Sequence, residues 1–177
     1  IVHFAERPLK RLKAVMATRH MPPREAMIVW SKATRDPVDD VRLLAYAMKD
    51  ASEKKLAERI LALTDALPDI PVRMRNSYHE TIAALCWELV YHRLAQGAVS
   101  EHWLQAARRH MERVLDPLAA KPVLPAAPSR PDGDSWLLYG RILLDSGDLA
   151  LAVNAFTNAK AGGIDEQKIL PWLAEIA

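Results

Sequence analysis

The chain has 177 residues, of which 50% are hydrophobic and 26% are charged, the usual mixture for one globular domain. Its single cysteine, Cys86, excludes an internal disulfide framework and a cysteine-rich zinc site. No apolar run reaches the roughly 18–20 residues of a membrane-spanning helix. Alanine and leucine dominate the apolar half and glycine is scarce, a balance that favours helices over a β-sandwich or barrel.

The net charge of +2 conceals an asymmetry along the chain. Residues 1–35 carry eight Lys or Arg against two Asp or Glu, a local charge of +6. Such a cluster is typical either of a solvated helix face or of the cytoplasmic flank of a membrane segment. No aromatic stacking motif or glycine-rich loop accompanies it, so nucleic-acid binding is not expected. We interpret these residues as a membrane-proximal basic segment that includes Arg7, Lys10, Arg11 and Lys13.

Helical signals begin at the N-terminus. Residues 1–35 are expected to form two short helices, the second over 24–34. Asp36 and Pro37 then supply an N-cap acid and a proline at the first helical position, which predicts a helix over 37–49.

The next segment contains a second set of helix-start signals. Asp50 and Glu53 resemble a capping box and predict a separate helix over 52–67. A longer helix is expected over 75–96, with Gly97 as its C-cap. A further helix is expected over 100–115, and we interpret residues 36–115 as degenerate helical hairpins.

Residues 116–133 interrupt this rhythm. They hold five of the twelve prolines together with small residues. This composition predicts an inserted, semi-extended linker.

Residues 134–163 carry the most specific pattern in the chain. Gly140 and Ala152 are small where two antiparallel helices would cross, and Gly147 stands in the expected turn between them. The segment resembles a tetratricopeptide repeat, and residues 164–177 resemble the first helix of a further unit. The signature residues of the complete unit are Trp136, Tyr139, Gly140, Leu143, Gly147, Asp148, Ala152, Phe156 and Ala159.

This resemblance implies an all-α fold, a tetratricopeptide-like α-solenoid of antiparallel helix hairpins that spans residues 1–177 as one unit. It also implies a concave groove for a peptide or a partner helix. Carried over from the family, the groove positions are Leu137, Arg141, Leu144, Asp145, Lys168 and Glu175. An ordinary solvated or inter-repeat role for these residues remains the alternative. Of the five tryptophans, Trp87 and Trp136 are expected in the core, whereas Trp30 and Trp172 remain candidates for exposed anchors.

A narrower resemblance lies in residues 38–55, whose sequence VDDVRLLAYAMKDASEKK is similar to the corresponding region of the PelE family. PelE proteins are tetratricopeptide components of the Pel exopolysaccharide machinery. The resemblance implies a non-catalytic scaffold at the cytoplasmic face of a bacterial inner membrane, with PelD, PelF and PelG as protein partners. Membrane attachment would come from a segment before Ile1, because we expect the chain to be part of a longer protein.

No catalytic or cofactor motif emerges from the sequence. It contains no HExxH, P-loop, GxSxG or GxGxxG pattern, so no enzyme activity, metal, cofactor or small-molecule substrate is expected. Two other hypotheses remain open. One is a tetratricopeptide adaptor or co-chaperone of an unrelated pathway, and the other is a helical hydrolase that uses His102 and His110.

Overall fold

The computed structural model describes residues 7–115 and 132–177, and within these ranges the chain is all-α, as predicted, without a strand. The predicted linker therefore lies outside the described residues up to position 131. The helices, in chain order, are α1 (Pro8–Ala17), the 3-10 turn η1 (Thr18–His20), α2 (Pro23–Ala33), α3 (Asp39–Ala66), the 3-10 turn η2 (Leu67–Asp69), α4 (Val72–Tyr91), α5 (Gly97–Leu115), α6 (Gly133–Asp145), α7 (Leu149–Ala161) and α8 (Glu166–Ile176).

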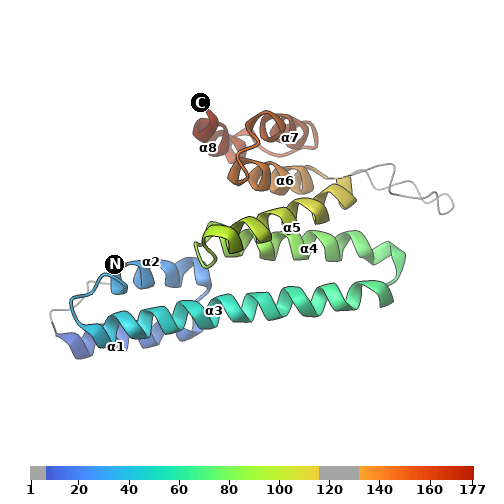
Figure 1. The fold of residues 1–177 in the computed structure, drawn as a ribbon. Helices are drawn as coiled ribbons and strands as arrows, with labels where there is room; N and C mark the ends of the chain where they lie inside the picture. Colours follow the sequence, from blue (N-terminus) through green and yellow to red (C-terminus); the bar gives the residue numbers. More distant parts are fainter. Residues whose placement is uncertain (1–6, 116–131) are drawn as a thin grey trace.

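The long helix α3 connects the α1–α2 region to the start of the α4–α5 hairpin. In Figure 1 it runs from beside α1 and α2 to the far end of α4, and it packs against all three. The predicted break near Asp50 is wrong, because residues 39–66 form one helix of 28 residues. Residues 50–53 contain no proline or glycine to stop the helix, and Asp50 instead forms an i,i+4 ion pair with Lys54 at 2.9 Å.

The start of α3 also differs from the prediction. The helix begins at Asp39, and Val38 occupies the N-cap position. Asp36 is instead buried, where its side chain accepts a hydrogen bond from the Val38 N–H at 2.9 Å. The same carboxylate forms an ion pair with Arg11 at 2.7 Å. Asp36 therefore ties α1 to the start of α3 rather than capping a helix.

Helices α4 and α5 form a hairpin whose turn comes earlier in the chain than the sequence pattern predicts. Helix α4 ends at Tyr91, and Arg93 then adopts a left-handed conformation with φ of +54°. The backbone N–H groups of Leu94 and Ala95 both donate to the carbonyl oxygen of Leu89. Gly97 consequently does not cap α4; it begins α5, also with a positive φ. Leu94 and Ala95 continue the apolar pattern because the turn buries them.

Helices α6 and α7 form a second hairpin, at the positions that resemble a repeat. Gly140 faces the buried ring of Phe156 so closely that a Cβ atom there would lie 2.5 Å from Cε1 of that ring. Gly147 adopts φ of +79° in the turn, a conformation that glycine tolerates well. This close approach explains why small residues stand at the crossing point.

Helix α6 is shared by two apolar clusters. One cluster is built from α1 to α5 and includes Ile142 of α6, whereas the other joins α6, α7 and α8. Trp136 and Tyr139 pack against both. In the described part of the chain, no helix is both long and apolar enough to cross a membrane.

Candidate interaction surface

Three aromatic rings and one arginine gather where α4, α6 and α8 meet. Trp87 and Tyr91, both on α4, stack with their ring centroids 4.5 Å apart. Trp172 of α8 lies with its ring centroid 6.2 Å from that of Trp87 and 6.0 Å from that of Tyr91. Arg141 of α6 completes the group, and we call these four residues the aromatic–arginine cluster.

Arg141 lies against both indoles of the cluster. Its guanidinium carbon is 4.8 Å from the ring centroid of Trp172 and 5.5 Å from that of Trp87, within the range of cation–π attraction. Its Nε atom is buried without a hydrogen-bond partner, and the described residues provide no carboxylate within ion-pair distance of it. Burial lowers the pKa of this guanidinium, which nevertheless stays charged because arginine does not lose its proton in proteins. The cluster therefore holds a positive charge that forms no ion pair within the described residues, although the charge of Asp134 acts on it from farther away.

Two carboxylates border the cluster. Asp145 accepts a hydrogen bond of 2.7 Å from Nε1 of Trp87, which fixes the orientation of that indole. Desolvation raises the pKa of Asp145, the Trp87 hydrogen bond opposes that shift, and the nearby charge of Glu175 adds to it. The surface consequently presents one cation against aromatic rings, with the carboxylates of Asp145, Glu175 and Asp134 in its surroundings.

The structure brings together only part of the predicted groove. Arg141 and Asp145 lie at the cluster, and Glu175 is close enough to influence Asp145 electrostatically. Leu137 does not line an open groove, because it is 5% exposed and belongs to the core of α6 to α8. Leu144 also packs against that core, and Lys168 is exposed on α8, four residues before Trp172.

Trp172, a candidate for an exposed anchor, lies in the cluster, whereas Trp87 and Tyr91 were not expected there. Trp87 packs on the core as expected, but it is only partly buried and its ring also lies against Arg141. The spacing of Trp87 and Tyr91 was a usable signal, since residues four apart lie on the same helix face. The expectation for Trp30 was also wrong: it is buried and donates from Nε1 to Oγ1 of Thr18 at 2.8 Å.

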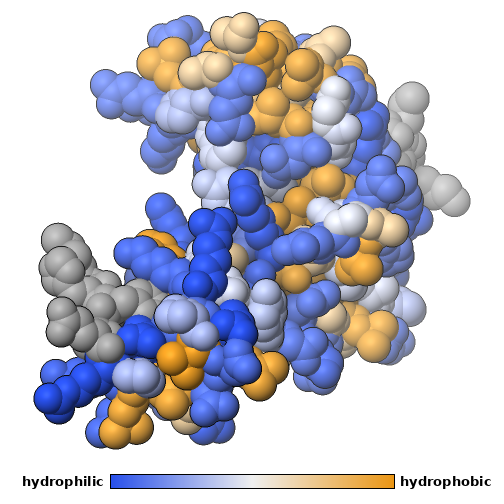
Figure 2. Space-filling view, turned by 60° about the vertical axis from the view of Figure 1, so that its left-hand side comes forward, coloured by the Kyte–Doolittle hydropathy of each residue, from blue (hydrophilic) through white to orange (hydrophobic). Residues whose placement is uncertain are grey.

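A recess lies on the same side of the molecule. Figure 2 shows a hollow between the C-terminal helices and the N-terminal helices, with mostly hydrophilic side chains around it. In Figure 1, α8 and α2 border this side from opposite ends, and the α4–α5 turn lies between them. Arg24 of α2 acts electrostatically on His92 of that turn, which places the two elements close together.

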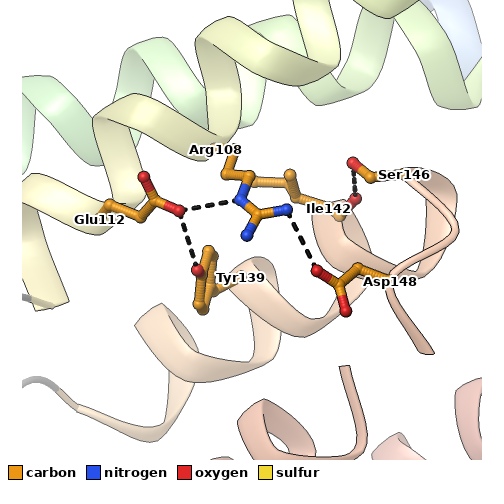
Figure 3. Close-up of polar contacts among 6 residues, drawn as sticks. All are labelled: Arg108, Glu112, Tyr139, Ile142, Ser146 and Asp148. Carbon is orange, nitrogen blue, oxygen red and sulfur yellow. Dashed lines mark hydrogen bonds and ion pairs between the residues drawn. The ribbon is translucent and has the colours of Figure 1, made fainter. Parts of the chain in front are cut away.

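A polar network on the other face of α6 fixes the position of this helix (Figure 3). Arg108 of α5 bonds to Glu112 at 2.8 Å and to Asp148, in the α6–α7 turn, at 3.3 Å. The hydroxyl of Tyr139, on α6, donates a hydrogen bond of 3.2 Å to the same Glu112. These contacts hold the α6–α7 hairpin on α5, and they thereby set the position of Arg141 over α4.

A pair of histidines joins α4 to α5. Nδ1 of His79 lies 2.7 Å from Nδ1 of His110, so one nitrogen donates and the other accepts, and the accepting ring is neutral. Burial lowers the pKa of both rings, that of His110 to about 4, and the charges of Arg113, Arg75 and Arg109 act in the same direction.

The arrangement that the hydrolase hypothesis requires is not formed. His102 is exposed and contacts Trp103, whereas His110 pairs with His79. Burial raises the pKa of Cys86 to about 12, so its thiol is protonated at neutral pH. In residues 7–115 and 132–177, no three His, Cys, Asp or Glu side chains are grouped so as to hold a metal ion.

Comparison with known proteins finds no family model, curated protein or solved structure that matches the chain. The described residues define an all-α protein. The choice among possible functions therefore depends on the geometry of its surfaces.

Proposed function

We propose that the chain is a non-catalytic scaffold that binds a segment of a partner protein at the aromatic–arginine cluster. The observation that carries the proposal is the guanidinium of Arg141, which lies against two indoles and has no carboxylate within ion-pair distance in the described residues. Tryptophan, tyrosine and arginine are the residues most often responsible for binding energy in protein interfaces.

The cluster also indicates the chemistry of the segment. A carboxylate of the partner would pair with Arg141, since a planar guanidinium binds carboxylates in a bidentate manner. An apolar side chain next to that carboxylate would cover Trp172 and Tyr91, which are only partly buried in the chain alone. The carboxylates of Asp145 and Glu175 would repel a segment with further acidic groups on their side.

The packing of the helices supports a tetratricopeptide-like arrangement. Helix α6 contacts both α4 and α8, while α5 and α7 pair with α4 and α6 as the second helices of two hairpins. A stack of such hairpins presents its first helices on one face, and all four cluster residues come from α4, α6 and α8.

The resemblance of residues 38–55 to the PelE family makes this proposal more specific. On that reading the scaffold assembles a Pel exopolysaccharide synthase complex at the cytoplasmic face of the inner membrane, and its partners are PelD, PelF and PelG. A co-chaperone or adaptor of another pathway would use the same surface with different partners, so the choice of partner protein separates the two readings.

Binding measurements with purified PelD, PelF and PelG test both parts of the proposal. Arg141→Gln and Trp172→Ala are expected to weaken binding about tenfold or more, the effect of losing an interface hot spot. Arg59→Gln, an exposed arginine on α3, is the matched control and should bind as the unchanged chain does. Thermal unfolding of each variant checks that the fold is intact.

The possible outcomes separate the surface from the partner. Binding that survives both Arg141→Gln and Trp172→Ala removes the cluster as the binding surface. Failure of the unchanged chain to bind any of the three Pel proteins removes the Pel assignment and favours an adaptor of another pathway.

A further inference from the structure

The outer face of α1 combines exposed apolar side chains with lysines. Leu9 is 64% exposed and Met16 is 48% exposed. They lie seven residues apart, with Lys13 between them, so the three share one face of the helix. Lys10 is exposed beside them, and the opposite face of α1 packs on the core through Leu12 and Val15.

The same pattern recurs on α2. Ile28 is 65% exposed, and Arg24 and Lys32 stand four residues before and after it on the same face. Figure 2 shows apolar side chains scattered among hydrophilic ones at this lower end of the molecule.

The positive charge of this region is largely uncompensated. Arg11, one of the predicted basic residues, does not contribute to an open cationic face, because it is mostly buried and forms an ion pair with Asp36. For the other Lys and Arg side chains between residues 7 and 35, the described part of the chain offers no ion pair, and Glu25 is the single acid in that range. Those basic side chains are Arg7, Lys10, Lys13, Arg19, Arg24, Lys32 and Arg35.

Helix α3 shows that exposed leucines alone do not distinguish this face. Leu43 and Leu61 are as exposed as Leu9, at 66% and 62%. However, residues 39–66 carry six Asp or Glu against five Lys or Arg, so α3 has no cationic surplus. Compared with α3, the α1–α2 region therefore joins exposed aliphatic side chains to an uncompensated positive charge.

We propose that the outer face of α1 docks on a membrane surface rich in anionic lipids, with Leu9 and Met16 inserted between the headgroups. Lys10 and Lys13 would contact lipid phosphates, and α2 would add to the attractive field. A helix that lies in the interface typically has this composition. A protein partner is the less suitable occupant, because the face has no aromatic anchor among its exposed residues 9–17 and offers a flexible row of lysines rather than a pocket.

Vesicle co-sedimentation of the whole chain tests the proposal. The chain should bind vesicles of phosphatidylcholine with phosphatidylglycerol, and it should not bind vesicles of phosphatidylcholine alone. Binding should disappear at about 1 M NaCl, where the Debye length falls to about 3 Å. Lys10→Glu/Lys13→Glu is expected to weaken binding about tenfold or more, and Leu9→Ser/Met16→Ser several-fold.

Two matched controls come from α3. Leu43→Ser/Leu61→Ser and Lys55→Glu/Arg59→Glu alter equally exposed side chains outside the proposed face and should leave vesicle binding unchanged. The proposal is overturned if the unchanged chain binds neither vesicle, if it binds both equally, or if the α1 and α3 variants weaken binding to the same degree. Absence of vesicle binding together with loss of PelD, PelF or PelG binding in the α1 variants would assign the face to a protein. Because vesicles need no protein partner, this test is independent of the aromatic–arginine cluster.

Discussion

The central part of α3 and the α6–α7 hairpin are both helical, yet they are held in different ways. No side chain of residues 46–59 in α3 is fully buried, and only partly buried side chains such as Met48 and Leu56 pack on the core there. Helices α6 and α7 instead bury a side chain at almost every turn and approach each other closely at Gly140. The N-terminal region therefore depends on a few specific contacts and on local helix stability, whereas the C-terminal hairpin depends on close packing of its side chains.

The largest expected effect lies in the C-terminal hairpin. Phe156→Ala removes a ring that is almost fully buried against Gly140, and it should lower the free energy of unfolding by about 3–5 kcal/mol. Leu61→Ala on the exposed face of α3 should change it by no more than about 0.5 kcal/mol. Urea denaturation measures both. Similar values for the two variants would contradict the distinction between the regions.

The next effect concerns the tie between α1 and α3. Asp36→Ala removes a buried carboxylate that pairs with Arg11 and accepts from the Val38 N–H, and it should cost about 2–4 kcal/mol in the free energy of unfolding. Asp50→Ala breaks the exposed ion pair with Lys54 and should cost at most about 0.5 kcal/mol, so it is the matched control.

The ion pair between Asp36 and Arg11 should also make the free energy of unfolding depend on pH. Burial opposes the charge of Asp36, but the hydrogen bond from Val38 and the charge of Arg11 outweigh it and lower its pKa. The stabilisation is therefore present above the ordinary pKa of 3.8 and is lost as the pH falls through the lower folded value. If the Asp36 and Asp50 variants lose equal stability, the Asp36–Arg11 ion pair contributes no more to the free energy of unfolding than the exposed Asp50–Lys54 pair.

The smallest expected effect concerns the histidine pair of α4 and α5, which lies between the two regions. The pKa of His110 is about 4 in the folded chain, against an ordinary value of 6.5. The unfolded chain binds the proton more readily, so stability should fall by about 1–2 kcal/mol between pH 7 and pH 5. His110→Asn removes this proton site and should flatten the dependence, as measured by urea midpoints across that range.

The exposed His102 supplies the control for this prediction. It lies on the same helix as His110, and His102→Asn should leave the pH dependence of the unfolding free energy unchanged. A flat profile in the unchanged chain would mean that the two rings do not share a buried hydrogen bond.

Local signals predicted much of the secondary structure but not the lengths of its elements. The small residue at Gly140 and the turn at Gly147 located the α6–α7 hairpin, because close crossing and a positive φ restrict the residue type strongly. The expected break near Asp50 was wrong, and the break near Gly97 exists but begins earlier, after Tyr91. The residues at those positions can lie either at a helix end or inside a helix, and tertiary packing decided where each helix begins and ends.

The candidate surface was predictable only in part for the same reason. Arg141 and Asp145 were found by their positions in the repeat-like hairpin, and Glu175 by its position in the segment that resembles the start of a further unit. Trp87 and Tyr91 belong to helix α4, much earlier in the chain, and the register between α4 and α6 brings Trp87 to Arg141.

The sequence by itself determined that this protein is helical, that residues 134–163 form a closely crossed hairpin, and that its positive charge is concentrated near the N-terminus. These properties follow from composition and short-range spacing. Only the tertiary structure decided that Arg11 is withdrawn from the cationic surface by Asp36, that His79 pairs with His110, and that Arg141 lies against two indoles. Each of these contacts joins residues that are far apart in the chain, so each depends on how the helices pack, which no local pattern encodes.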